Sequence, residues 1–203
     1  MKLWVLLIAA TCTLFFSCWL RKAPEEIHVT ADSTAVNEVP TLKDGNFFPV
    51  TGYIKGQINS IKSGNINPLQ VVIEGGKTDS SWLKPDQLEK NLGEFLTPAI
   101  DTANLKTLFK QNSFLDQTIN AFTFTYDPIA TLPDSMELRH WDVYVDPEKF
   151  NISKIYLIKN KDSGKRQLQL TWRNNQSAKI LSILNKPDGS RTVEKETTIT
   201  WNF

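Results

Sequence analysis

Residues 140–157, HWDVYVDPEKFNISKIYL, decide the fold that the sequence predicts. Apolar residues alternate with polar ones on both sides of the turn signal Asp146-Pro147, and these apolar residues are Trp141, Val143, Val145, Ile155 and Leu157. A period of two is typical of a β-strand with one buried face. Asp and Pro favour a turn because one hydrogen-bonds its own backbone and the other fixes φ. The segment therefore predicts two consecutive strands of one sheet.

The same period continues through the C-terminal half of the chain. Its alternating apolar positions are Phe122, Phe124, Tyr126, Leu168, Leu170, Trp172, Leu181, Ile183, Val193, Ile199 and Trp201. Turn signals separate these runs at Asp162-Ser163-Gly164, Asn174-Asn175 and Pro187-Asp188-Gly189. Because the runs lie too close together for crossover helices, the sequence predicts an antiparallel meander.

The N-terminal half of the domain follows a helical period instead. Between Pro49 and Gly64, apolar residues recur at helical spacing and predict an amphipathic helix: Val50, Tyr53, Ile54, Ile58 and Ile61. Residues 68–74 predict a short buried strand, residues 85–98 a second helix and residues 103–111 a third, short one. The predicted fold class is α+β, with N-terminal helices packed on a C-terminal antiparallel β-meander sheet.

The chain begins with the pattern of an export signal. Lys2 precedes an apolar run over residues 3–20. The segment Phe15-Phe16-Ser17-Cys18 resembles the box that ends bacterial lipoprotein signals, in which the last residue is the acylated cysteine. This resemblance implies a signal peptide over residues 1–17, lipidation of Cys18 and attachment to a membrane. Two alternatives stay open: a second box that ends at Cys12, and an uncleaved anchor, because the run is close to the shortest length that spans a bilayer.

Residues 18–46 predict a lipidated N-terminus and flexible tether, and residues 47–203 predict one globular domain. The tether keeps neither period, although Ile27–Val29 could add an edge strand. Cys12 and Cys18 are the only cysteines, so the domain has no disulfide and no thiol nucleophile. We expect an extracytoplasmic location in the cell envelope.

The net charge argues against a nucleic-acid partner. Removal of Lys2 with the signal leaves 22 basic residues against 22 acidic residues. A balanced chain without a basic stripe is not typical of nucleic-acid binding. The chain has two histidines, His28 in the tether and His140 in the domain, and the domain has no thiol, so no ligand spacing suggests a metal and the sequence predicts neither a metal nor a cofactor. The domain is expected to be monomeric.

One short segment offers acid–base chemistry. His140 and Asp142 share a face of a predicted strand, with Tyr144 beyond them. An imidazole and a carboxylate on one surface could serve a hydrolase, but such a site needs a third partner and a pocket. The sequence favours a polar row facing solvent, opposite the core face.

The tryptophans offer a second kind of candidate site. Trp141, Trp172 and Trp201 could form a stacking platform for a ligand, but each alternates in phase with aliphatic residues, which favours the core. Trp82, expected in a loop before the second helix, is the better candidate for an exposed ligand-binding residue.

Residues 141–157 also resemble the strand, Asp-Pro turn and returning strand of periplasmic lipoprotein-carrier half-barrels, which hold acyl chains between a curved sheet and helices. The likeness spans fewer than about twenty residues and is one of fold only. The sequence favours a non-catalytic binding or assembly module for an envelope protein or apolar ligand. The alternatives are an extracytoplasmic hydrolase using His140 and Asp142, and a signal-anchored structural component.

Overall fold

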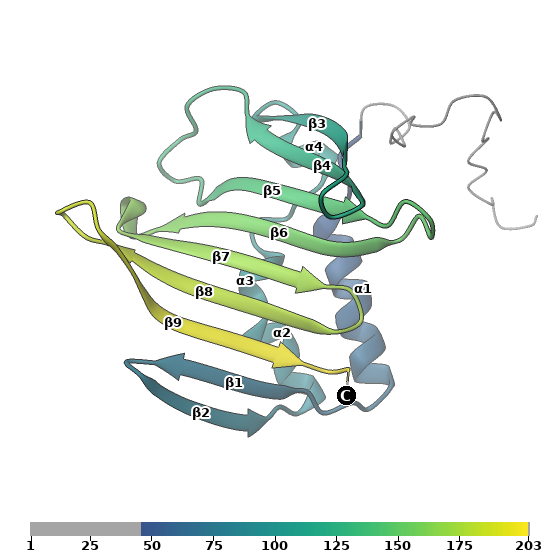
Figure 1. Cartoon of the computed structure of the whole chain (residues 1–203), viewed down its shortest axis with the longest axis vertical. Helices are drawn as coiled ribbons and strands as arrows, with labels where there is room; N and C mark the ends of the chain where they lie inside the picture. The colour runs from purple at the N-terminus through teal and green to yellow at the C-terminus, as the bar shows by residue number, and fades with distance from the viewer. Residues whose placement is uncertain (1–45, 203) are drawn as a thin grey trace, which may run out of the picture. The chain divides into compact units, whose positions relative to one another are not determined.

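The computed structural model describes residues 46–202, except for the side chains of Thr102 and Asn104. The predicted signal, Cys18 and nearly all of the predicted tether therefore lie outside the described residues. The described part is a nine-stranded antiparallel sheet with helices on one face (Figure 1). The α+β class and the N-terminal position of most helices are as the sequence predicts.

Seven strands follow one another as a meander, as the period of two predicts. They are β3 (Phe109–Asp116), β4 (Ala121–Pro128), β5 (Leu138–Val145), β6 (Ile152–Lys161), β7 (Arg166–Arg173), β8 (Ser177–Asn185) and β9 (Arg191–Thr200). Each pairs with the next in antiparallel register. The 3-10 turn η3 (Asp162–Gly164) joins β6 to β7.

The sheet is larger than this meander, because a hairpin from the N-terminal half extends it. Strand β1 (Leu69–Glu74) pairs with β9, and β2 (Lys77–Trp82) pairs with β1. The full order is β2-β1-β9-β8-β7-β6-β5-β4-β3. Gly75 and Gly76 join β1 to β2 with φ angles of 57° and 75°, which a two-residue hairpin turn requires and which glycine adopts without strain.

Helix α1 (Val50–Ser63) lies behind the sheet in Figure 1. Its buried residues Val50, Ile54, Ile58 and Ile61 follow the predicted helical spacing. The expected second helix is broken into η2 (Pro85–Gln87), α2 (Leu88–Asn91) and α3 (Gly93–Leu96). Gly93 lies at this break, and glycine is a poor helix former. The last helix, α4 (Thr102–Leu105), is a single turn.

Three local expectations are wrong. The segment 68–74 is a strand but only half-buried, because its outer face is not covered by a helix. Residues 103–111 are not one helix, since α4 ends at Leu105 and β3 starts at Phe109 to pair with β4. Trp82 is not in a loop but ends β2.

The core lies between the helices and the inner face of the sheet. Trp141 and Trp172 are fully buried and Trp201 is nearly so, which confirms the core interpretation of these three indoles. The Trp141 ring stacks on Tyr126 at a centroid distance of 4.5 Å. Trp172 meets Phe95 of α3 edge-to-face at 5.5 Å. The first contact joins neighbouring strands β4 and β5, and the second binds the helical layer to the sheet.

Candidate functional site

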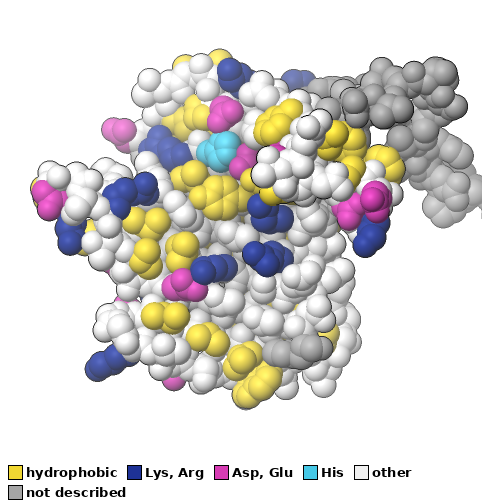
Figure 2. Space-filling model, viewed as in Figure 1, with side chains coloured by type: hydrophobic (Ala, Val, Ile, Leu, Met, Phe, Trp, Pro, Cys, Tyr) yellow, Lys and Arg dark blue, Asp and Glu magenta, His cyan; other side chains and the backbone are white. Residues whose placement is uncertain are grey.

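The two faces of the sheet differ in what they carry. We call the face under the helices the covered face and the other the open face; Figure 2 shows the open face. Residues directly opposite each other in neighbouring strands share a face. One open-face row therefore runs from Tyr144 through Lys154, Arg173, Ser177, Thr200 and Leu69 to Trp82. The four predicted ligand-binding residues all lie on this face: Trp82, His140, Asp142 and Tyr144.

His140 stands between two carboxylates on the open face. Its Nδ1 lies 2.9 Å from Asp127 Oδ1, on the neighbouring strand β4, as a hydrogen bond. Its Nε2 lies 2.9 Å from Asp142 Oδ1, at ion-pair distance but without hydrogen-bond alignment. The Tyr144 hydroxyl donates to Asp142 Oδ2 at 3.2 Å. The structure thus brings the three predicted residues together and adds Asp127, which the sequence reasoning missed.

These carboxylates shift the protonation of the cluster. The Asp142 carboxylate raises the pKa of His140 most, burial opposes it, and Asp127 raises it further, so that the pKa lies above its ordinary value of 6.5. Burial and the negative charge of Asp142 raise the pKa of Tyr144. The polar row faces outward as predicted, but Asp142 is buried, with 7% of its surface exposed. The four residues of this cluster, Asp127, His140, Asp142 and Tyr144, therefore contact one another.

This geometry leaves little room for base catalysis. A histidine that activates a nucleophile needs one ring nitrogen facing it while the other is oriented by a carboxylate. In this cluster both nitrogens face carboxylates. A protonated imidazole has two donors and no acceptor. His140 is therefore placed to join β4 and β5, and the arrangement does not supply a general base.

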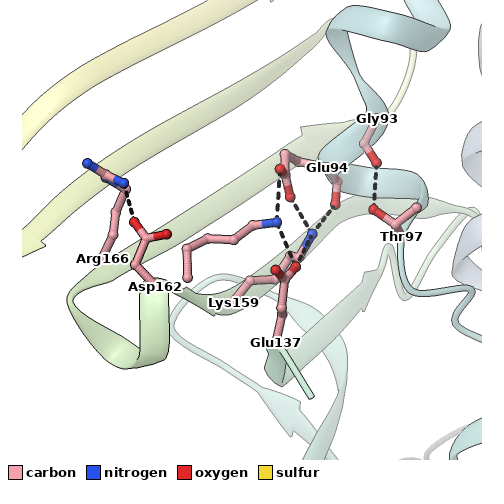
Figure 3. A network of polar contacts seen from close by, with 8 residues as sticks. Gly93, Glu94, Thr97, Glu137, Lys159, Asp162 and Arg166 are labelled. Atoms are coloured by element: carbon pink, nitrogen blue, oxygen red, sulfur yellow. Dashed lines mark hydrogen bonds and ion pairs between the residues drawn. The ribbon is translucent and has the colours of Figure 1, made fainter. Parts of the chain in front are cut away.

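A second polar cluster lies on the covered face (Figure 3). Lys159 on β6 has no exposed surface. Its ammonium forms an ion pair with the Glu94 carboxylate of α3, and a longer one with Glu137, in which Nζ lies 3.7 Å from Oε2. It also donates to the Glu94 main-chain oxygen at 3.2 Å. Lys161 Nζ completes the cluster at 2.6 Å from Glu137 Oε2 and 3.1 Å from Glu94 Oε1.

The charges of this cluster are paired, and the direction of the Glu94 pKa shift agrees with that pairing. Burial alone would raise the pKa of Glu94, but hydrogen bonds and charges from Lys159 and Lys161 lower it overall. A buried ammonium is costly unless it is paired and hydrogen-bonded. Lys159 has both kinds of partner from α3, so its role is to fix that helix on the sheet.

Apolar side chains gather on the open face over β1 and β2, at the bottom of Figure 2. We define the apolar strip as Leu69, Val71, Ile73 and Trp82, which register places on one face of the hairpin. Trp82 is 63% exposed and Ile73 is 41% exposed. Contiguous exposed apolar surface of this kind is typical of an interaction site. The strip includes Trp82, the predicted exposed indole.

Two further properties bear on function. Within residues 46–202, no group of three or more His, Cys, Asp or Glu side chains is arranged to hold a metal ion. None of the helices in that range is long and apolar enough to cross a membrane.

Comparisons with known proteins give the chain no relative. It matches no protein-family model, no curated protein and no solved structure.

Proposed function

We propose that the chain is a membrane-anchored envelope lipoprotein that acts as a non-catalytic binding or assembly module. Its partner is a protein that docks on the apolar strip. The single observation that carries this proposal is the exposed strip on the β1–β2 hairpin, at one edge of a sheet whose other face carries the core. The predicted export signal and Cys18 supply the location and the anchor.

The hairpin also supports a particular way of docking. Among the described strands, β2 pairs only with β1, so its other edge presents main-chain donors and acceptors. An extended segment can bind such an edge as an added strand and place alternate side chains on the neighbouring face. In this arrangement, side chains of the added strand contact Trp82. Lys77 and Asp79 lie on β2, where charges discourage indiscriminate strand pairing and favour a complementary partner.

The packed core supports a protein partner over an apolar cargo. A carrier half-barrel holds its cargo between sheet and helices, but here large side chains without exposed surface meet across that space, among them Phe95, Trp141 and Trp172. The hydrolase alternative is weakened by the two occupied nitrogens of His140.

Photo-crosslinking in the native cell tests the docking. A photoreactive residue at Ile73, on the strip, is expected to yield one discrete adduct heavier than the protein, and Trp82→Ala is expected to reduce its yield. The matched control is the same residue at Lys55, which is exposed on α1. Equal adducts from both positions, an adduct with the mass of a second copy, or no adduct would overturn the proposed partner.

Mass spectrometry of the mature N-terminus tests the anchor independently. The expected product begins at Cys18 and carries acyl chains, and Cys18→Ser is expected to remove them. Because one acyl chain binds a membrane only marginally, we expect more than one chain on the cysteine. An unmodified product that still begins at Met1 would contradict the lipoprotein proposal and favour a retained signal anchor.

A further inference from the structure

Two cations oppose each other at the centre of the open face. Lys154 on β6 and Arg173 on β7 are register partners, so their side chains leave the sheet side by side. Like charges directly opposite in a sheet are destabilising. Figure 2 shows basic side chains in this central area. A repulsive pair of this kind calls for a compensating negative charge.

Asp142 and Asp116 exert a favourable charge on Lys154 from a distance, but among the described residues no carboxylate forms an ion pair with either cation. Neither Lys154 nor Arg173 has an ion pair within residues 46–202, and the Lys154 ammonium instead lies 3.7 Å from the centre of the Tyr144 ring. The nearby carboxylate of Asp142 is already held by His140 and Tyr144. Lys179, farther along the face, is paired with Glu196 at 2.6 Å. Lys154 and Arg173 are thus two adjacent cations on the open face without an ion-pair partner among the described residues.

A pair of shallow cavities surrounds these two cations. One, of about 290 Å³, is lined by Lys154 and Arg173 together with Tyr144, Ser153 and Gln176. The other, of about 310 Å³, is lined by Arg173 together with hydroxyl groups of Thr171, Ser177 and Thr198. Arg173 borders both cavities. The hydroxyls of Ser153 and Tyr144 already donate within the fold, so the neutral donors near the two charges are the Gln176 amide and the hydroxyls of Thr171, Ser177 and Thr198.

We propose that Lys154 and Arg173 form a binding site for a phosphate group. A guanidinium presents a planar fork of donors that fits phosphate oxygens, and an ammonium adds a point charge. Two positive charges match a dianionic phosphate monoester better than a single carboxylate. Since the cavities are open to solvent, the phosphate belongs either to a small soluble molecule or to a lipid headgroup whose remainder projects away from the sheet.

The protonation of Lys154 agrees with this site. Burial, together with the charge of Arg173, lowers the pKa of Lys154. A bound phosphate reverses the second contribution by placing a negative charge between the cations. The site lies three strands from the apolar strip in the sheet order, and it does not depend on the proposed protein partner.

Calorimetry on the full-length protein in an uncharged detergent at low ionic strength tests the proposal. The probes are inorganic phosphate, glycerol 3-phosphate and a short-chain phosphatidic acid, which carries its phosphate as a monoester. We expect binding of at least one probe, weakened about tenfold or more by Lys154→Gln and by Arg173→Gln, as loss of a charge-assisted hydrogen bond implies. Arg173→Lys keeps the positive charge but removes the planar set of guanidinium donors, so we expect its affinity to lie between that of the parent and that of Arg173→Gln.

The probes distinguish the two sources of phosphate. Binding of the soluble phosphates indicates a small-molecule ligand, and binding of the lipid alone indicates a headgroup site. The control is Lys55→Gln, which removes the same charge from an exposed position on α1 and should leave the affinity unchanged. The proposal is overturned if no probe binds, if acetate binds as tightly as phosphate, or if Lys55→Gln weakens binding as much as Arg173→Gln. Circular dichroism confirms that each variant is folded.

Discussion

On the covered face of the sheet a buried ammonium, Lys159, meets the carboxylates of Glu94 and Glu137, whereas on the open face Lys154 and Arg173 oppose each other without an ion-pair partner among the described residues. The same difference holds for tryptophan, since Trp172 is fully buried and Trp82 is 63% exposed. The charged groups of the covered-face cluster are paired within the fold. Lys154 and Arg173 on the open face have no ion-pair partner among the described residues, and this contrast supports the proposal that the open face binds a partner.

The largest expected difference between the faces comes from the two tryptophans. Trp172→Ala should lower the free energy of unfolding by about 3 to 5 kcal/mol, because it opens a cavity among Phe95 and Trp201. Trp82→Ala should change it by less than about 0.5 kcal/mol, as exposed positions usually do. Chemical denaturation measures both. Similar losses for the two variants would mean that the strip is part of the core.

The next largest effect should come from the buried ion pair. Glu94→Ala leaves Lys159 with weaker partners, so unfolding should become easier by about 3 kcal/mol, near the lower end for a broken buried pair. The matched variant is Glu89→Ala, which breaks the exposed Lys62–Glu89 pair of 3.0 Å and should cost less than about 0.5 kcal/mol. Denaturant midpoints at neutral pH give the comparison. A larger loss of stability from Glu89→Ala than from Glu94→Ala would contradict the conclusion that the covered-face ion pair stabilises the fold more.

The smallest effect concerns His140, and it depends on pH. Its folded pKa is raised above 6.5, so the protonated imidazole stabilises the fold fully below its unfolded pKa, and this contribution is lost as pH rises through the folded pKa. His140→Gln should therefore cost about 1 kcal/mol at acidic pH and less at alkaline pH. Unfolding of parent and variant across this range measures the difference. A cost that grows with pH would show that His140 is neutral in the fold.

The strands of the meander could be predicted because each buries one face and therefore alternates. Strand β2, with the sequence KTDSSW, has no apolar alternation because every residue in it is exposed. The Gly75-Gly76 pair directly after the apolar run of β1 was the one hairpin cue, but the run that follows it lacks the apolar alternation of a strand. The helix expected over residues 103–111 is wrong because pairing with β4 overrides the helical spacing of Leu105, Leu108 and Phe109.

The candidate sites were harder to predict, because their partners are far apart in the chain. His140 and Asp142 were placed on one face by alternation alone, but Asp127 joins them only through the pairing of β4 with β5. Lys159 lies in phase with Leu157, so alternation alone places a charged side chain on the core face and does not explain it. Its partner Glu94 is 65 residues away, and no local pattern links the two.

Oxidative footprinting of the protein in intact cells and after purification tests most directly whether the open face is the binding surface. Trp82 and Phe150 are almost equally exposed, at 63% and 61%, but only Trp82 belongs to the apolar strip. If a partner covers the apolar strip, we expect Trp82 to be oxidised less in the cell than in the purified protein. Phe150 should be oxidised equally in both. Equal oxidation of Trp82 in the two preparations, or equal protection of Phe150, would contradict this prediction.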